Sequence, residues 1–476
     1  MTDTRELLNR ITAFRQRLDG SAAVIEAGPA VSVAEPDGFR QSLRKLTGAV
    51  TADDPLPPQL TQRARDLLGL AKTLLDRQRR FAADPVVAGL SGASDPAAPD
   101  VLVAYHRETV AMMGSAVRMA QVFPESPSLQ LKMCDGLEGV LEVVKERLTV
   151  QERALAMRRT DFARIDRLAG ILAAMNRFQP VNLNPLAALA EELLEDARQG
   201  KPIRFLHADP RSTCSYPGGV EFPAPARFVA AHALTAAQVV ARVVHLDYEW
   251  AGRPLPAVVG ALVMDAGMLR MKPEVLAKPG RFTPGDYRDV EQHAKFGAEL
   301  LIRFIPDAAP VAAGVASHHE RADGTGYPAG LKGNAIPSLG RLLAAADVYA
   351  ARCCPRTYRP AQDTRAALTD VLLMAETGQL DKDFAEYLVS LAFYPVGAVV
   401  ELTDGRVGVV AANHPDRLDP RAPGRPVIAV LADADGQLLS RPEHLDLSAS
   451  ARGGILRTLP DDRRRELLGG RYPDLV

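Results

Sequence analysis

Two aspartates lie inside apolar runs that should be buried in a folded chain, and this pattern limits the fold more than any other feature. Asp265 lies in VVGALVMDAGML, and Asp347 lies in LLAAADVYAA. A carboxylate buried without a partner costs several kcal/mol, so each needs a cation, a metal ion or hydrogen-bond donors. No Lys or Arg lies three or four residues from Asp265, whereas Arg341 and Arg352 are near Asp347. A metal ion is therefore the simplest partner.

Histidines that could complete a metal site lie in the same part of the chain. Five of the nine fall between residues 230 and 320, namely His232, His245, His293, His318 and His319. His232 lies in ARFVAAHALTAAQVV, a helix-compatible apolar run, so its ring should face a core or a cleft, whereas His245 is interpreted as peripheral. The adjacent His318 and His319 would point about 100° apart on a helix, which suits the two sides of a groove. Imidazole and carboxylate ligands together favour iron, manganese or zinc.

A glycine-rich loop follows the histidine pair. The segment HHERADGTGYPAGLKGNAIP has Gly324, Gly326, Gly330 and Gly333 within ten residues, which predicts a loop and not a helix. Glycines let a backbone approach a ligand closely. Tyr327 could stack on a base and Lys332 could meet a phosphate.

These residues resemble the signature of bacterial HD-GYP domains. The resemblance rests on His318-His319-Glu320, on Asp323-Gly324-Thr325-Gly326-Tyr327-Pro328 and on Asp347. Order and spacing agree at a second set of positions: His232, Asp265, Lys278-Pro279-Gly280, Thr283 and His293. The resemblance covers roughly residues 226 to 400 and leaves the N-terminal helices outside it.

The resemblance implies a fold, an activity and a set of roles. Family members are all-helical, metal-dependent phosphodiesterases that open cyclic di-GMP with two or three metal ions and a bridging hydroxide. By resemblance, Asp265 would be catalytic and bridge the metals, with iron or manganese favoured over zinc. One metal would be held by His293, His318 and His319, and the other by His232 and Asp347. The ligand cleft would be lined by Lys278, Tyr327, Lys332, Arg356 and Arg359, because cationic side chains, arginine above all, bind phosphate oxygens.

Three positions depart from the family pattern. Met264 replaces the namesake histidine, Met268 replaces a lysine, and Ala350 replaces a further aspartate. A thioether is a poor ligand for hard or borderline metals, so the metal on the His232 side should bind weakly. One lost electrostatic contact commonly costs roughly 10²- to 10³-fold in rate. The sequence therefore predicts a degenerate member that keeps one metal, held by Asp265, His293, His318 and His319.

Three functions stay open at this point. The first is a regulatory module that binds a cyclic dinucleotide or a protein partner through the Gly-Tyr-Pro loop, with reduced or lost hydrolysis. The second is an active cyclic di-GMP phosphodiesterase in which water, Glu249 or Asp247 fills the gap left by Met264. The third is a non-catalytic scaffold, which would leave buried polar groups without a ligand and is costly for that reason.

The whole chain is expected to be mainly α and to contain several domains, because 476 residues exceed what one core supports. The expected parts are a helical sensory, dimerisation or docking region at 1–200, an HD-type domain at 226–395, a small β-hairpin unit at 396–450 and a C-terminal tail at 451–476. Residues 83–100 are expected to be a linker. A proline-free stretch at 137–178 predicts one long helix, with apolar residues every seven positions from Leu141 and a second set offset by three that includes the polar Gln151 and Arg158. It would be either an ordinary bundle helix or the seam of a homodimer.

Composition narrows the partners and the compartment. Lys plus Arg total 57 against 58 Asp plus Glu, so no global charge imbalance indicates DNA or an anionic membrane. The sequence shows no signal peptide and no uncharged apolar stretch long enough to span a bilayer. Four cysteines without CxxC spacing fit a reducing compartment, so a cytoplasmic protein is expected.

Overall fold

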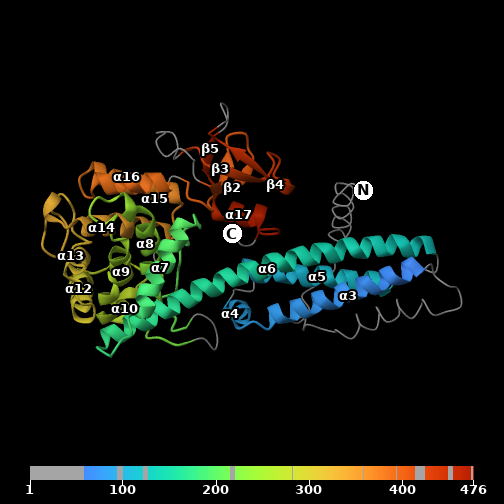
Figure 1. Cartoon of the computed structure of the whole chain (residues 1–476), viewed down its shortest axis with the longest axis horizontal. Helices are drawn as coiled ribbons and strands as arrows, with labels where there is room; N and C mark the ends of the chain where they lie inside the picture. The colour runs from blue at the N-terminus through green and yellow to red at the C-terminus, as the bar shows by residue number, and fades with distance from the viewer. Residues whose placement is uncertain are drawn as a thin grey trace. The chain divides into compact units, whose positions relative to one another are not determined.

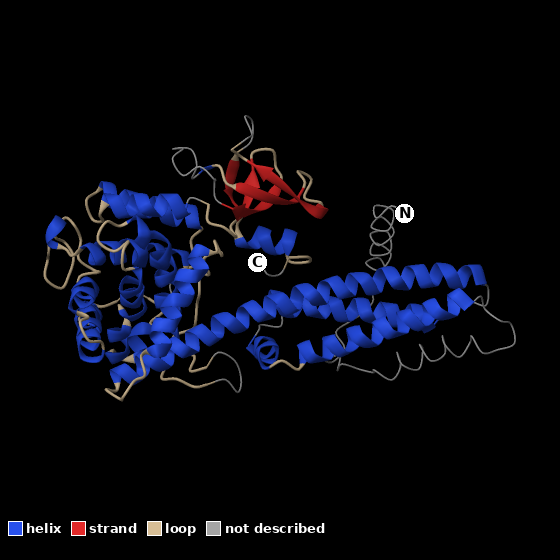
Figure 2. Ribbon diagram, viewed as in Figure 1, coloured by secondary structure: helices blue, strands red, loops and turns tan. Residues whose placement is uncertain are grey.

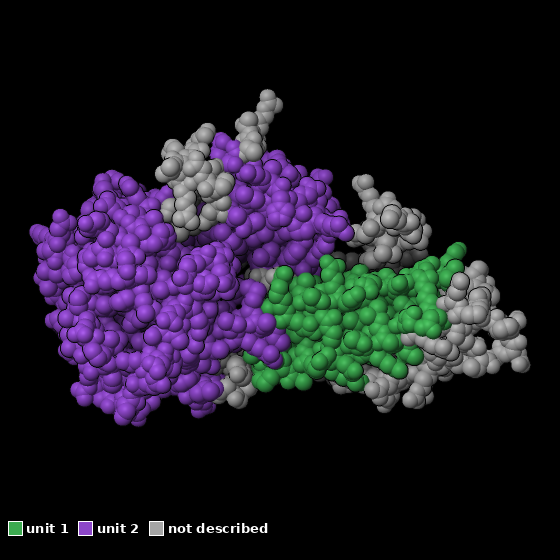
Figure 3. All heavy atoms as spheres, in the orientation of Figure 1, with its two compact units in different colours: residues 1–154 green, residues 155–476 purple. Residues whose placement is uncertain are grey.

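The computed structural model divides the chain into two compact units, residues 1–154 and 155–476 (Figure 3). It describes residues 58–93, 100–121, 127–214, 220–280, 282–356, 359–392, 394–412, 424–448, 454–472 and 475. Helices dominate both units, and a small sheet lies near the C-terminus (Figure 2). The predicted fold class is confirmed.

The first unit is a bundle of helices. It contains α3 (Pro58–Ala82), α4 (Pro85–Ala93), α5 (Val101–Gln121) and the first part of α6 (Pro127–Asn176). α4 lies within 83–100, so the expectation of a plain linker there was wrong. Leu141 and Leu148, which belong to the heptad of α6, are fully buried in a core shared with Leu74 of α3 and Met113 of α5. In this part of the chain, the leucine face of α6 is therefore covered by the chain's own helices.

A polar layer crosses the same bundle where the heptad is interrupted. The buried Gln151 of α6 donates through Nε2 to Oγ1 of Thr109 over 2.6 Å, and its Oε1 lies 3.1 Å from Nδ1 of His106. Arg147 donates to the same threonine hydroxyl over 3.0 Å. Because Gln151 is satisfied within its own unit, it needs no second copy of the chain, which favours the bundle-helix alternative over a homodimer seam. The homodimer stays a prediction.

The second unit begins in α6 and continues through α7 (Asn184–Arg198) to an all-helical domain (Figure 1). Its elements are α8 (Ala226–Val243), η3 (Val244–Leu246), α9 (Pro254–Val263), η4 (Ala266–Arg270), α10 (Pro273–Leu276), α11 (Pro284–Glu291), α12 (His293–Phe304), α13 (Ala309–Ala316), η5 (Gly333–Ala335), α14 (Ser338–Cys353), α15 (Thr364–Glu376) and α16 (Lys382–Ala392). α8 is the central helix, packed against α7, α9 and α14. Small apolar residues on every face explain why nearly all of it is buried.

The segment Ala226–Leu246, which comprises α8 and η3, is long and apolar enough to cross a membrane by length and composition alone. However, 89% of its most apolar window is buried inside the domain. The core helix of a globular domain passes the same test, so this segment is weak grounds for a membrane span.

Two glycines bring α12 against the chain around Asp265. A Cβ on Gly267 of η4 would lie 2.1 Å from the carbonyl oxygen of His293, and a Cβ on Gly297 would lie 2.8 Å from the carbonyl oxygen of Met264. Any larger residue would push the two backbones apart. This close approach places the first residue of α12, His293, beside Asp265.

A five-stranded antiparallel sheet forms the C-terminal part of the second unit. Its strands are β1 (Val399–Leu402), β2 (Val407–Ala412), β3 (Val427–Ala432), β4 (Leu438–Asp446) and β5 (Ile455–Thr458), in the order β4-β3-β2-β1-β5, and α17 (Asp461–Leu468) follows. A turn at Asp404-Gly405 joins β1 to β2, with Gly405 at φ 86°. β5 pairs with β1, so the sheet continues past residue 450 into the segment expected to be a tail.

The close packing at Gly267 generates a test of the fold. Gly267→Ala should lower the free energy of unfolding by about 1 to 3 kcal/mol, because the added methyl collides with the backbone of α12. Thermal unfolding of the purified chain measures this. Gly252→Ala is the matched control, since a Cβ there meets nothing within 4 Å. Equal destabilisation by both substitutions would show that the contact is not tight.

Candidate metal centre

Asp265 lies between α9 and η4 and is buried among apolar side chains. Its side chain is 2% exposed. Oδ1 lies 3.3 Å from Nε2 of His293 and 3.8 Å from Nε2 of His318. Oδ2 is buried, lies 3.5 Å from Nε2 of His232 and has no hydrogen-bond partner among the described residues. Burial alone would raise the pKa of Asp265, but the imidazoles of His293 and His318 beside it hold that pKa well below its ordinary value. The group is therefore a carboxylate with one oxygen left over.

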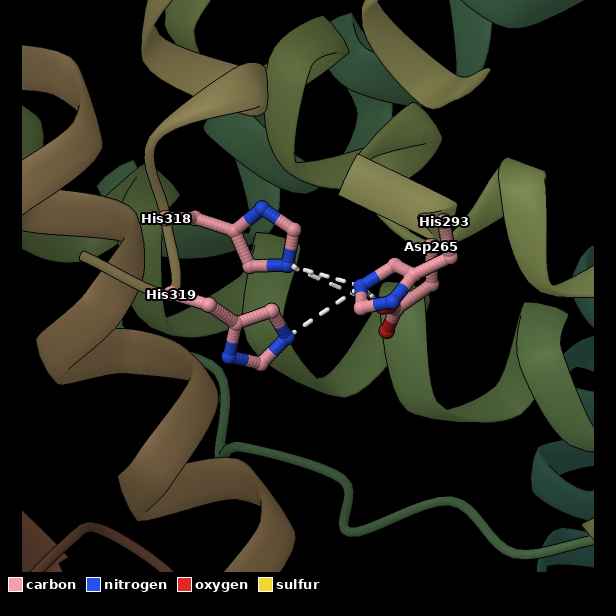
Figure 4. Close-up of side chains that lie close together, drawn as sticks. All are labelled: Asp265, His293, His318 and His319. Carbon is pink, nitrogen blue, oxygen red and sulfur yellow. Dashed lines mark hydrogen bonds and ion pairs between the residues drawn. The ribbon is translucent and has the colours of Figure 1, made fainter. Parts of the chain in front are cut away.

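The first group of ligand atoms comes from Asp265, His293, His318 and His319, and their atoms all lie within 4.8 Å of one another (Figure 4). His293 begins α12, while His318 and His319 follow the end of α13. Nε2 of His293 lies 3.3 Å from Nε2 of His318 and 3.2 Å from Nε2 of His319. Figure 4 shows the three rings pointing toward one point from opposite sides.

Hydrogen bonds to Nδ1 of His293 and His318 determine whether Nε2 of each ring, which faces the other ligand atoms, carries a lone pair. Nδ1 of His293 donates to the carbonyl of Val290, and Nδ1 of His318 donates to the carbonyl of Val315 over 2.6 Å. In a neutral imidazole the proton then sits on Nδ1, and Nε2 carries the lone pair. Two lone pairs 3.3 Å apart repel unless a proton or a metal ion lies between them. This arrangement, with Nδ1 bonded to a carbonyl, is typical of metal-binding histidines.

His319 completes the first group as a neutral ring. Burial lowers its pKa well below the ordinary value, and the neighbouring imidazoles of His318 and His293 lower it further. A neutral imidazole is the form that binds a metal. The residues present therefore fit a divalent cation held by three imidazoles and one carboxylate.

The second group comes from His232 on α8, Asp265, and Asp347 on α14, again with ligand atoms within 4.8 Å. Here the hydrogen bonds differ. Nε2 of His232 lies 2.7 Å from Oδ1 of Asp347, and Nη2 of Arg356 lies 3.3 Å from Nδ1 of His232. A guanidinium can only donate, so Nδ1 accepts, and Nε2 carries the proton that it donates to Asp347. The two side chains satisfy each other.

The glycine-rich loop folds back onto the residue after the histidine pair. The buried carboxylate of Glu320 accepts hydrogen bonds from the backbone N–H of Ala329 over 2.7 Å and of Leu331 over 3.0 Å. Tyr327 stacks on His319, with ring centroids 4.8 Å apart and planes 26° apart. Burial, and the negative charge of Asp347 next, raise the pKa of Tyr327, so its hydroxyl stays protonated. Glu320 holds the loop, a role that sequence reasoning missed although the residue was part of the motif.

Comparisons with known proteins agree with this geometry. Residues 225–384 match the family described as an HD domain. The chain is 36% identical over 160 residues to a cyclic di-GMP phosphodiesterase of Pseudomonas aeruginosa, which covers 33% of this chain and 38% of that protein. It is 40% identical over 126 residues to a cyclic di-GMP phosphodiesterase response regulator of Xanthomonas campestris, covering 26% and 32%. The predicted resemblance to the HD-GYP family is therefore confirmed for the part of the chain that matches the HD domain, residues 225–384.

Other matches extend the comparison. A 3'3'-cGAMP-specific phosphodiesterase of Vibrio cholerae is 35% identical over 108 residues, which is 23% of each chain. A solved HDG"Y"P protein from Bdellovibrio bacteriovorus aligns at 12% identity with a TM-score of 0.34, over 56% of this chain and 86% of that one. The curated relatives described here are each matched over 38% or less of their own length.

The C-terminal sheet has a family of its own. Residues 399–461 match a KOW domain associated with HD domains. The sequence predicted only a small β-hairpin unit there, because the pairing of β5 with β1 joins segments more than 50 residues apart in the chain. The sheet thus matches a type of domain that is associated with HD domains.

The three departures from the HD-GYP pattern lie in or against the apolar core. Met264 and Ala350 are fully buried in it, and Met268 is partly buried against it. Among the described residues, none of these three positions belongs to either group of ligand atoms.

Asp247 and Glu249 were the residues predicted to fill the gap left by Met264 if the site is active. Asp247 accepts hydrogen bonds from the backbone N–H of Trp250 over 2.9 Å and from the hydroxyl of Ser338 over 3.1 Å, so it shapes the turn after η3. Glu249 is 48% exposed and lies 3.7 Å from Arg253. Among the described residues, neither belongs to a group of ligand atoms.

The predicted ligand-binding residues are placed differently from one another. Tyr327 and Arg356 lie against the metal groups. Lys278 is 2.5 Å from the carboxylate of Asp286, and Lys332 is exposed and crosses over Gly324.

Arg359 was predicted to bind ligand but contacts the end of α14. Its guanidinium donates to the carbonyls of Ala351, Arg352 and Pro360. These bonds satisfy carbonyls that the last turn of a helix leaves open. For Lys278, Lys332 and Arg359, ligand binding stays a prediction.

The two ligand groups should differ in metal binding. Loss of a residue that only hydrogen-bonds to a metal ligand commonly weakens metal binding roughly 10- to 100-fold. His318→Ala should weaken it by more, because this substitution removes a ligand itself. His232→Ala should leave the bound metal in place. Metal content after loading and gel filtration measures both, with His444→Ala on the exposed β4 as control. Equal metal loss in both variants would contradict the difference between the groups.

The loop contact gives a second test. Glu320→Gln replaces one acceptor oxygen by a donor, which leaves a buried backbone N–H facing an N–H. We expect a loss of about 1 to 3 kcal/mol in the free energy of unfolding. Chemical denaturation measures this against Glu386→Gln, an exposed position on α16. Unchanged stability would mean that the loop does not depend on Glu320.

Proposed function

We propose that this chain is a signalling protein whose HD-GYP domain holds one divalent metal and binds a cyclic dinucleotide, with hydrolysis reduced or lost. The metal ligands are Asp265, His293, His318 and His319. One observation carries the proposal: His232 and Asp347 are already hydrogen-bonded to each other, and Arg356 fixes the proton of His232 on the nitrogen that a second metal would need. In the other group, Nδ1 of His293 and of His318 is bonded to a backbone carbonyl, and Oδ2 of Asp265 has no hydrogen-bond partner among the described residues.

Iron and manganese are the favoured metals, and zinc also suits three imidazoles and a carboxylate. A bound metal supplies a Lewis acid and lowers the pKa of a coordinated water. The chain's own residues do the rest. Asp265 offers a carboxylate of fixed charge in a dry site, and the carbonyls of Val290 and Val315 hold the rings of His293 and His318 in the orientation that binding requires.

The reduced hydrolysis follows from groups that the site lacks. A pair of metals stabilises both the attacking and the leaving oxygen of a phosphodiester, so a weak second site loses part of that stabilisation. Met264 offers only a thioether where a ligand is needed, and Met268 offers no charge near the reacting phosphate. Each such loss costs roughly 10²- to 10³-fold in rate.

The proposed ligand class rests on relatives and on the groups beside the site. The relatives act on cyclic di-GMP or 3'3'-cGAMP by their names, and both molecules consist of two purine nucleosides joined by phosphodiesters. Arg356 suits a phosphate oxygen and Tyr327 suits a base or a sugar. A protein partner at the Gly-Tyr-Pro loop, and a cytoplasmic location, belong to the same proposal.

An active phosphodiesterase is the second candidate. It is favoured by the three protein ligands of the second group, which lie together within 4.8 Å even without the namesake histidine. Turnover of cyclic di-GMP by the unaltered chain, abolished in Asp265→Ala, would establish this alternative. Failure to bind either metal or nucleotide would leave a scaffold.

The decisive variant restores the missing ligand. Met264→His should raise cyclic di-GMP hydrolysis by roughly 10²-fold or more over the unaltered chain, since it returns a ligand to the second group. Product is measured with iron or manganese under anaerobic conditions. Met264→Leu keeps the apolar volume and is the control, expected to leave the rate unchanged. If the histidine variant hydrolyses cyclic di-GMP no faster than the leucine variant, the absence of a histidine at position 264 is not what limits turnover.

A further inference from the structure

A hollow opens beside His232, on the side away from the first ligand group's own residues. It holds about 180 Å³ of space between atoms, part of it open to solvent. Its walls come from three stretches of chain: Leu206, His207 and Ala208; then Phe228, Ala231 and His232 of α8; then Cys354, Pro355 and Arg356 after α14. The first of these walls lies before residue 225, outside the part that matches the HD domain.

The segment carrying His207 is fixed to α8 by buried polar side chains. Gln238 binds Arg204 twice, accepting from its N–H over 2.9 Å and donating to its carbonyl over 2.9 Å. The hydroxyl of Thr235 accepts from the N–H of Leu206 over 3.0 Å. Gln238 and Thr235 are both almost completely buried. The wall is therefore a built part of the domain and not a loose lead-in.

The next contact closes the wall against the loop after α14. The thiol of Cys354 donates to the carbonyl of Leu206 over 3.3 Å. Leu206 is buried, whereas the neighbouring His207 is exposed. Leu206 and His207 both line the hollow, and His207 is the one of the two that is exposed to solvent.

The mouth has a positive character that suits an anion. The guanidinium of Arg356 lies 5.1 Å above the ring of Phe228 and uses one nitrogen on His232. Both His207 and Arg356 line the hollow, and burial, followed by the charge of Arg356, lowers the pKa of His207. The nearby carboxylate of Asp209 is engaged with Arg211 at 2.7 Å. Within the described residues, the ring of His207 has no hydrogen-bond partner.

We propose that His207 is a further ligand-binding residue, which together with Arg356 binds a phosphate group of the cyclic dinucleotide on the His232 side of the metal centre. The proposal rests on the proposed function. A metal is the wrong occupant, because Arg356 repels a cation and His207 belongs to neither ligand group. A phosphate oxygen accepts from both side chains at once, and the planar fork of Arg356 leaves further N–H groups for it. The segment before the HD domain thus contributes to recognition.

The test is binding of cyclic di-GMP and 3'3'-cGAMP to the manganese-loaded full chain, by calorimetry. His207→Ala should weaken binding by roughly 10-fold, the scale of one hydrogen bond to a charged group, and leave metal content unchanged. His207→Arg should restore most of the affinity, because a guanidinium also donates to phosphate. His444→Ala, on the exposed strand β4, should bind as the unaltered chain does.

The outcomes separate this inference from the proposed function. Equal affinity of His207→Ala and the unaltered chain overturns the role of His207 and leaves the proposed function standing. Loss of metal in His207→Ala also overturns it, since the residue would then support the metal group. If the unaltered chain binds neither nucleotide, both the inference and the proposed function fall.

Discussion

The carboxylate of Asp265 in a dry core is the constraint on which the rest of the domain depends. It belongs to both groups of ligand atoms, and no hydrogen bond from the described residues to its second oxygen offsets the cost of burial. The neighbouring packing serves this one side chain. Gly267 and Gly297 let α12 come close enough to place His293 against it, and the end of α13 brings His318 to the other side. A change that moves α12 would therefore disturb charge as well as packing.

The two ligand groups differ in which imidazole nitrogens carry protons and not in the distances between their ligand atoms. Both groups hold their ligand atoms within the same 4.8 Å. In one, backbone carbonyls take the outer N–H of two rings, so lone pairs meet in the centre. In the other, an arginine donates to the outer nitrogen of His232, so a proton meets a carboxylate instead. A list of conserved ligand types would treat the groups alike, whereas their hydrogen bonds assign them different chemistry.

Much of the site was predictable because polar residues in apolar runs have few explanations. Asp265, Asp347 and His232 stood out in this way, and the structure brings them together with His293, His318 and His319. What could not be predicted depends on contacts between distant parts of the chain. The carbonyls bound by Arg359, the pairing of β5 with β1, and the wall formed by His207 all have this origin. α4 was missed for a local reason, since its glycines and flanking prolines favour a linker by composition.

Glu320 has a consequence for any molecule that meets the Gly-Tyr-Pro loop. Its two oxygens accept hydrogen bonds from the loop residues Ala329 and Leu331. Breaking either bond would leave a buried carboxylate oxygen without a donor. The loop therefore has its shape before an encounter, and a partner need not supply the conformational entropy of ordering it. Recognition on such a surface selects partners by shape, and small changes in a partner's contour should be discriminated more sharply than on a loop that folds during binding.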